Sequence, residues 1–136
     1  MSIIIKNFIY NLLNRIIFID PRGGKDKEFF RTPYYDLAKI SHSLLGGYDY
    51  IINNIAMIEY DQDMKAYLNF NGAFDRDNEK LFKSFVESLG YDLNLIRAVE
   101  ASLFISMLSL HIDDTRKVYM LALRASELLS KKSFSL

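Results

Sequence analysis

The sequence predicts an α+β protein in which small β-hairpins are followed by a mainly helical bundle. Three observations support this fold class: a β-branched apolar run at 16–19, a second pair of strand-like segments at 55–70, and helical apolar spacing from 75 to 130. With 136 residues, the chain is long enough for one domain with a core but too short for two. We therefore expect residues 1–136 to form a single domain, with a hairpin at 1–20 and a mainly helical part at 33–136.

The first predicted hairpin covers residues 3–20. Its strands are Asn7–Tyr10 and Arg15–Asp20, and the Asn-Leu-Leu-Asn segment between them suits a turn. The run Ile16-Ile17-Phe18-Ile19 is continuous rather than alternating, which indicates a strand buried on both faces. A loop with Gly23-Gly24 is expected at 21–32.

A helix is predicted from Thr32-Pro33 to the Gly46-Gly47 pair. Thr32 suits the N-cap, Pro33 suits the first helical position, and the glycines end the helix. The residues that share its apolar face are Tyr34, Leu37, Ala38, Ser41, Leu44 and Leu45.

The remainder is predicted as a short helical or turn segment at 48–54, a hairpin of strands 55–60 and 65–70, and helices at 75–89, 93–110 and 115–130. In the hairpin, Ala56, Ile58 and Tyr60 should share a face with Ala66, Leu68 and Phe70. Residues expected in the core are Ile17, Ile19, Leu37, Leu44, Phe85, Leu103, Met107, Leu121 and Leu128.

Composition narrows the class of protein. Seventeen basic and seventeen acidic residues cancel, so no basic excess favours nucleic acid or an anionic membrane surface. The absence of cysteine excludes disulfides and thiolate metal sites. We expect no stretch to reach the roughly 18–20 apolar residues needed to span a bilayer. No cleavage site of a signal peptide follows the apolar start. The cytoplasm is the expected location.

Asp20 is the leading candidate for a metal ligand. It ends the predicted strand Arg15–Asp20, whose apolar run is typical of a buried strand, and it precedes a Pro-Arg-Gly-Gly loop that leaves room for a ligand. Asn7 belongs to the neighbouring predicted strand. A hairpin would bring Asn7 and Asp20 to the same open end, where an amide oxygen and a carboxylate suit Mg²⁺ completed by phosphate and water. The plainer interpretation of a lone Asp after a strand is a turn former or helix cap.

The segment from Lys6 to Ile40 resembles the metal-binding half of the aminoglycoside phosphotransferase and choline kinase-like superfamily, which shares the protein-kinase fold. In that family, a His-Gly-Asp motif is followed after four residues by Asn, then by an apolar hairpin with an Ile-Asp metal ligand, and then by a helix that begins near Asp-Leu-Ala. The corresponding residues here are Lys6-Asn7-Phe8-Ile9-Tyr10, Phe18-Ile19-Asp20 and Tyr35-Asp36-Leu37-Ala38.

The resemblance implies that Asn7 and Asp20 hold the two Mg²⁺ ions of bound ATP. It also implies that Asp36 braces the catalytic loop by accepting backbone hydrogen bonds. The Asp-Pro-Arg-Gly form, together with His42-Ser43 and Gly47-Tyr48-Asp49, is most similar to bacterial proteins of capsule and surface-polysaccharide gene clusters. The implied substrate is the hydroxyl group of a small molecule such as a sugar or an amino alcohol.

The chain departs from the family at the catalytic base, because the position of the base Asp falls at Ser2. Serine has no carboxylate to accept the proton of a substrate hydroxyl, so no catalytic residue is assigned. Nothing before it corresponds to the N-terminal lobe. Three hypotheses follow: a truncated phosphotransferase-like domain that is inactive alone, one subunit of a split kinase completed by a separate N-terminal lobe or upstream polypeptide, or a non-catalytic binding or scaffold module.

Three further polar residues have alternative interpretations. Arg22 is a possible phosphate contact through its fork of donors, or a loop arginine paired with Asp26 or Glu28. His42 is expected to be a partly exposed helix histidine without function, with contact to a substrate as the alternative. His111, close to Asp113 and Asp114, is better explained by helix ends than by a metal site.

Overall fold

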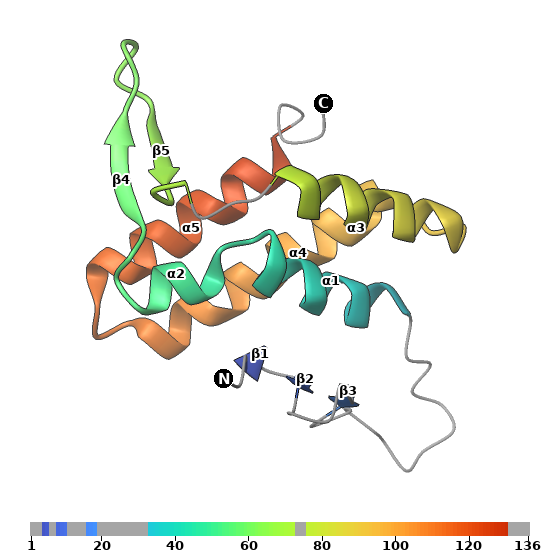
Figure 1. Ribbon diagram of the computed structural model, residues 1–136. Coiled ribbons are helices and arrows are strands. Elements are labelled where there is room, and N and C mark those ends of the chain that lie inside the picture. Colours follow the sequence, from blue (N-terminus) through green and yellow to red (C-terminus); the bar gives the residue numbers. More distant parts are fainter. Residues whose placement is uncertain (1–3, 6–7, 11–15, 19–32, 73–75, 131–136) are drawn as a thin grey trace. The chain divides into compact units, whose positions relative to one another are not determined.

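The computed structural model of the chain describes residues 4–5, 8–10, 16–18, 33–72 and 76–130. The chain divides into two compact units, Met1–Arg31 and Thr32–Leu136. The boundary between them falls just before the helix predicted at Thr32-Pro33. Figure 1 shows the elements of both units in chain order.

The first unit contains a three-stranded antiparallel sheet. Its strands are β1 (Ile4–Ile5), β2 (Phe8–Tyr10) and β3 (Ile16–Phe18), in the order β1-β2-β3. Phe8 lies opposite Phe18 and Tyr10 opposite Ile16. The β2–β3 pair confirms the predicted hairpin, whereas β1 was not predicted. The predicted turn at 11–14 and loop at 21–32 lie outside the described residues.

The second unit begins with two helices, α1 (Pro33–Leu44) and α2 (Tyr48–Ile52). Pro33 occupies the first helical position of α1, where a missing N–H costs little because that group has no intrahelical partner. Gly47 has a φ of 75°, a left-handed conformation that favours glycine, and it separates the two helices. The predicted start and stop of α1 are therefore confirmed.

The second hairpin is formed by β4 (Met57–Tyr60) and β5 (Ala66–Asn69). Ile58 pairs with Leu68 and Tyr60 with Ala66, so the predicted shared face is confirmed for these residues. In the turn, the Asp61 carboxylate accepts hydrogen bonds from the backbone N–H groups of Asp63 and Lys65, both at 2.9 Å. This is the local side-chain bonding by which Asp favours turns.

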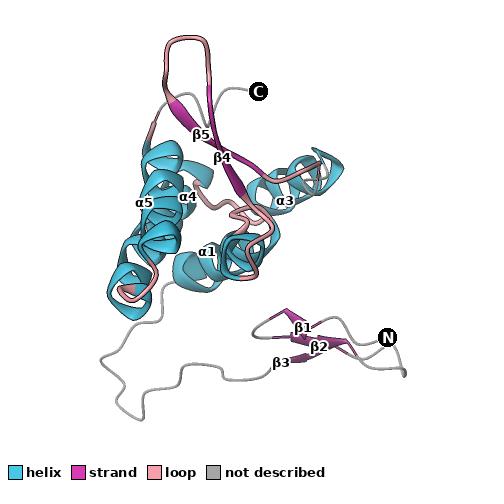
Figure 2. Cartoon of the chain, turned by 90° about the vertical axis from the view of Figure 1, so that its left-hand side faces the viewer, coloured by secondary structure: helices cyan, strands magenta, loops and turns pink. Residues whose placement is uncertain are grey.

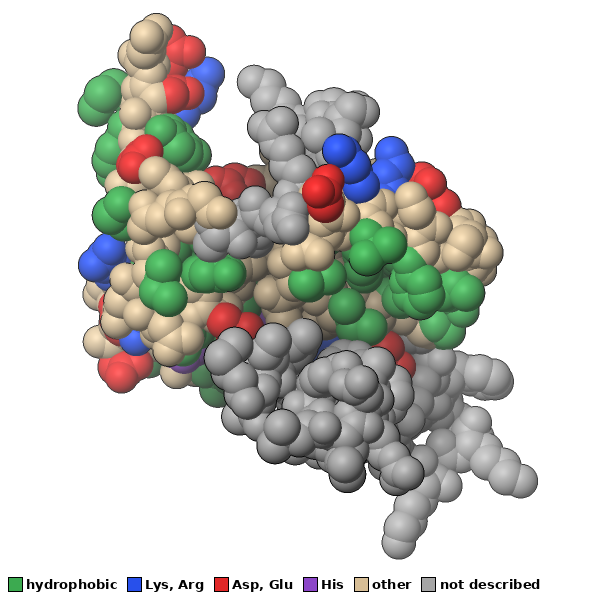
Figure 3. Space-filling view, viewed as in Figure 1, with side chains coloured by type: hydrophobic (Ala, Val, Ile, Leu, Met, Phe, Trp, Pro, Cys, Tyr) green, Lys and Arg blue, Asp and Glu red, His purple; other side chains and the backbone are tan. Residues whose placement is uncertain are grey.

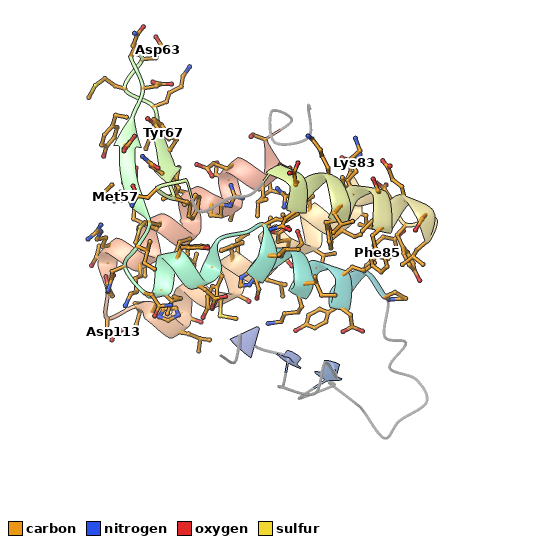
Figure 4. All side chains as sticks on the ribbon, in the orientation of Figure 1. Met57, Asp63, Tyr67, Lys83, Phe85 and Asp113 are labelled. Carbon is orange, nitrogen blue, oxygen red and sulfur yellow. The ribbon has the colours of Figure 1, made fainter. Side chains whose placement is uncertain are left out.

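Helix α3 (Arg76–Ser88) buries a narrower stripe than its sequence suggests. Phe82 and Val86 are buried, but Phe85 is 50% exposed and Leu81 is 70% exposed. The prediction that Phe85 belongs to the core is wrong, because the apolar stripe of α3 is wider than the surface that covers it. Figure 4 shows Phe85 and Lys83 on different sides of this helix, and Figure 3 shows hydrophobic side chains along its surface.

Two long helices complete the unit. α4 (Leu93–Met107) continues into a 3₁₀ turn at Leu108–His111, and α5 (Thr115–Leu129) follows. Asp92 and Asp114 are their N-caps, and each carboxylate accepts a backbone N–H bond from the first turn, at 2.8 Å and 3.1 Å. Figure 2 shows α5, α4 and α1 from the side, with the β4–β5 hairpin extending away from them.

Buried side chains of Thr32–Leu136 form two clusters. The α4–α5 cluster consists of Tyr48, Ile51, Ala56, Leu68, Phe70, Ala101, Phe104, Met120, Leu121, Ala125 and Leu128. The α1–α3 cluster consists of Leu37, Ala38, Leu45, Phe82, Val86, Ile96 and Leu103.

The clusters test the predicted core. Leu37, Leu103, Leu121 and Leu128 are buried as expected, and Met107 is partly buried against the α4–α5 cluster. The prediction for Leu44 is wrong, because this side chain is exposed and His42 takes a place in the interior instead. The side chains of Ile17 and Ile19 lie outside the described part of the chain.

One described segment, Leu93–His111, is long and apolar enough to cross a membrane by length and composition alone. The expectation that the chain holds no such segment is therefore wrong on these two criteria. Core helices of folded domains pass the same test, and α4 packs against both α1 and α5. It also carries the buried polar side chains of Arg97 and Glu100.

Candidate functional site

The predicted metal site is at the first hairpin, and its key residues lie outside the described residues. These are the predicted metal ligands Asn7 and Asp20; Arg22, the possible phosphate contact, and Ser2, at the position of the catalytic base, lie outside the described residues as well. The described strands nevertheless bear on it: the start of β2 and the end of β3 lie at the same end of the sheet, because Phe8 is opposite Phe18. In the sequence, Asn7 directly precedes β2 and Asp20 follows β3 by two residues.

Asp36 lies in the first turn of α1, and its side chain is exposed. A negative charge in the first turn complements the helix dipole. The catalytic loop that Asp36 would brace corresponds to residues 2–7, of which the structure describes Ile4 and Ile5 alone. The bracing role therefore stays a prediction.

His42 is buried, so the expectation of a partly exposed histidine is wrong. Its ring lies between two aromatic rings, with centroid distances of 4.6 Å to Tyr48 and 4.2 Å to Phe104. Tyr48 begins α2, and the turn at Gly47 brings it over this side of α1. With an exposed fraction of 3%, His42 belongs to the interior and does not face a bulk-solvent substrate site.

A buried ionic cluster, formed by Ser41, Arg97 and Glu100, joins α1 to α4. The Ser41 hydroxyl donates to Glu100 Oε2 at 2.5 Å, and Arg97 donates to the same Oε2 at 3.0 Å and to Ser41 Oγ at 3.2 Å. Glu100 is fully buried and Arg97 is 6% exposed. Because the Ser41 hydroxyl donates to a carboxylate, this arrangement differs from the serine–histidine pair of a nucleophilic site.

Gly46 closes the buried ionic cluster on the side of the α1–α2 corner. A methyl group at Gly46 would lie 2.6 Å from both Glu100 Oε1 and the backbone oxygen of His42. Only glycine leaves space for the carboxylate so close to the backbone. Among the described residues, Glu100 Oε1 has no hydrogen-bond donor.

Burial raises the pKa of Glu100 above its ordinary value of 4.5. The positive charges of Arg97 and Arg124 and the Ser41 hydroxyl act in the opposite direction. Burial is the larger effect, because a carboxylate loses its hydration here and gains donors on only one oxygen atom. This cluster therefore favours a neutral Glu100 more than an exposed site would.

Arg124 of α5 connects the α1–α2 corner to the second hairpin. Its guanidinium donates to the carbonyl oxygens of Gly46 and Leu45 at 3.0 Å and 2.9 Å, and to Glu127 Oε2 at 2.9 Å. Glu127 Oε1 in turn accepts the backbone N–H of Leu68 in β5 at 3.1 Å. These bonds satisfy two carbonyl groups in the corner that follows α1, and they hold α5 against this corner and against β5.

No metal centre is present in the described ranges, in the sense that no group of three or more His, Asp or Glu side chains there could hold an ion. Asp114 caps α5 and forms an ion pair with Lys117 at 3.3 Å. The helix-end interpretation of the His111 region therefore accounts for Asp114.

The sequence did not identify Arg97 and Glu100 as important residues. The available signal was a pair of opposite charges three positions apart inside an otherwise apolar helix. Comparison with known proteins adds no assignment: no family model, no curated protein and no solved structure matches this chain.

Proposed function

We propose that the chain provides the metal-binding half of an ATP- and Mg²⁺-dependent phosphotransferase of the kinase-like type, and that it does not transfer phosphate by itself. The observation that carries the proposal is the antiparallel pairing of β2 with β3, with Phe8 opposite Phe18. In the sequence, Asn7 directly precedes β2 and Asp20 follows β3 by two residues, which supports a common site for the two side chains.

In this proposal, the Asn7 amide oxygen and the Asp20 carboxylate hold Mg²⁺. The ion would neutralise charge on the phosphates of ATP. Arg22 contributes a fork of donors suited to a phosphate oxygen, and Asp36 holds the preceding loop in place. The substrate class is a small-molecule hydroxyl, from a sugar or an amino alcohol, in cytoplasmic surface-polysaccharide metabolism.

Ser2, at the position of the catalytic base, supports the proposal that phosphoryl transfer by this chain depends on another polypeptide. Ser2 cannot accept the proton of a hydroxyl substrate as a carboxylate does. Phosphoryl transfer depends mainly on positioned charges and on pairing of the phosphates by a lysine and a covering loop. We infer that an N-terminal lobe from a second polypeptide or segment supplies these groups.

Replacing Asp20 tests the metal-ligand role. We expect Asp20→Ala to abolish Mg²⁺-dependent binding of ATP, measured by isothermal titration calorimetry, while the melting temperature changes little. Asp26→Ala is the matched control, because it removes the same kind of side chain six residues further along the chain. Equal loss of affinity in both variants, or no loss in Asp20→Ala, would contradict the proposal.

The same titration separates the alternative function. The unit Thr32–Leu136 contains two buried clusters of its own, which favours a module able to bind a partner without nucleotide chemistry. A well-folded wild-type chain that shows no heat of binding with ATP, with or without Mg²⁺, would support that binding module instead.

A further inference from the structure

The β4–β5 hairpin extends from the helices of its unit and offers a strand edge. Figure 4 labels Met57, Tyr67 and Asp63 at its base, middle and tip, and Figure 1 shows that the hairpin extends away from the helices of its unit. A two-stranded ribbon has two edges, each with backbone N–H and C=O groups that point outward. Here the two edges differ in what they contact.

The hydrogen bonds of the hairpin determine which groups point outward. Asp61 N–H donates to the carbonyl of Lys65 at 3.0 Å, so this pair of residues is hydrogen-bonded. Bonded and non-bonded pairs alternate in an antiparallel ladder. The pairs Tyr60–Ala66 and Ile58–Leu68 are therefore non-bonded, and the backbone groups of these residues point away from the hairpin.

An independent contact confirms this assignment on the β5 side. The outward N–H of Leu68 donates to Glu127 Oε1, so α5 covers part of the β5 edge. On the β4 side, Ala56 N–H is bonded to the carbonyl of Tyr50. The part of the β4 edge without a bonding partner among the described residues is therefore Ile58 to Tyr60, with two N–H donors and two carbonyl acceptors. Tyr60 is 57% exposed.

The acidic side chains beside the β4 edge indicate which kind of strand could bind there. Glu59 lies between the two outward-facing residues, and Asp61 and Asp63 follow in the turn, with Lys65 as the one basic side chain of residues 57–69. Lys65 pairs with Asp63 at 3.4 Å. Hydrogen bonds from Asn69 and Tyr67, at 2.6 Å and 2.7 Å, lower the pKa of Glu59 and keep it ionised.

A second copy of β4 does not suit this edge. The antiparallel register that uses every outward group of both copies pairs Ile58 of one with Tyr60 of the other. It places the two Glu59 side chains directly opposite each other, and like charges in that position are destabilising. A strand with a basic residue opposite Glu59 would have the complementary charge.

We propose that the β4 edge binds an extended segment of another polypeptide that carries Lys or Arg, by adding a third strand to the hairpin. Main-chain bonds to Ile58 and Tyr60 would provide the attachment, and Glu59 the preference for a basic side chain. Ile58, Glu59 and Tyr60 have no role in the proposed phosphotransferase site, so the test does not depend on that proposal.

The test is an NMR titration of the ¹⁵N-labelled full chain with an acetylated, amidated peptide of alternating lysine and valine. We expect the amide signals of Ile58 and Tyr60 to shift and their hydrogen exchange to slow. A peptide with glutamate in place of lysine should bind at least about fivefold more weakly, because one or more cross-strand charge pairs would be reversed.

Two proline variants provide a matched pair. Tyr60→Pro and Ala66→Pro each remove an outward N–H from the same pair of residues, on opposite edges, and neither removes a bond between the strands. Tyr60→Pro should weaken binding by about tenfold, whereas Ala66→Pro should leave it nearly unchanged. Glu59→Gln, which leaves the backbone intact, should reduce the preference for the lysine peptide.

Several results would overturn the proposal. These are equal effects of the two proline variants, no preference for lysine over glutamate, or no shift at Ile58 and Tyr60 with millimolar peptide. A concentration-dependent dimer that Tyr60→Pro dissociates would assign the edge to a second copy instead. If Tyr60→Pro disorders the hairpin, the Glu59→Gln comparison decides the outcome alone.

Discussion

The carboxyl group of Glu100 is buried, and Ser41, Arg97 and Gly46 lie against it. Its pKa is raised in the folded chain, mainly by burial, whereas the unfolded chain should titrate near the ordinary value of 4.5. As pH rises above that value, the unfolded state loses this proton first. The contribution of Glu100 to stability is therefore greatest at low pH and decreases until the folded-state pKa has been passed.

We expect Glu100→Gln to remove this pH dependence. The difference in unfolding free energy between Glu100→Gln and the wild type should shift in favour of the variant as pH is raised from 4 to 8. Urea denaturation at several pH values measures it. Arg97 and Arg124 keep their charge over this range, so they contribute a constant background. A difference that stays constant, or that shifts in favour of the wild type, would show that Glu100 is ionised in the folded state.

At the scale of the helix, α3 offers a direct test of which side is buried. Phe82→Ala should lower the free energy of unfolding by about 3–5 kcal/mol, because it removes a buried ring from the α1–α3 cluster. Phe85→Ala makes the same chemical change three residues later, at a half-exposed position. Its effect should be below about 1 kcal/mol. Thermal or urea unfolding of both variants measures the contrast, and similar losses would contradict the assigned face.

Most element boundaries were predictable because they depend on local signals. Pro33 begins α1, and glycine follows both α1 and α3, at Gly46 and Gly90. The alternating apolar residues of β4 and β5 gave their pairing. β1 was missed because two residues are too few to show a period, although its pairing with β2 is local and places Ile5 opposite Phe8.

The buried sides of the helices were less predictable, because they depend on how neighbouring elements pack. Leu44 was assigned to the core by helical spacing, yet α4 and α2 cover the side that carries Ser41 and His42. Opposite charges three residues apart usually lie on solvated helix surfaces. The sequence around Arg97 and Glu100 does not distinguish them from such a surface pair. The buried ionic cluster could therefore be identified only from the folded structure.

The candidate metal site was predictable only as far as its scaffold. The pairing of β2 with β3 agrees with the expected hairpin. Asn7, Asp20 and Arg22 lie beyond the described residues, so their roles rest on the sequence and on the proposed experiment.

For the whole chain, the division at Arg31 has a consequence for folding. Among the residues whose burial the structure describes, those of both clusters belong to Thr32–Leu136. We therefore expect residues 32–136 alone to unfold cooperatively, with a melting temperature close to that of the full chain, measured by circular dichroism. A fragment that starts at residue 48 lacks α1 and leaves Glu100 without Ser41, so it should not melt cooperatively. A non-cooperative 32–136 fragment would show that the first unit is required for folding.

The hydrogen bonds of Arg124 also restrict which amino-acid substitutions this protein can accept during evolution. One guanidinium serves the carbonyls of Leu45 and Gly46 and the carboxylate of Glu127, which in turn holds β5. Lysine cannot reproduce this planar arrangement of donors. A lysine at position 124 would therefore not keep the bonds to Leu45, Gly46 and Glu127 at the same time. Substitutions at 124 and 127 should therefore be inherited together, and descendants of this sequence should show correlated changes at these two positions.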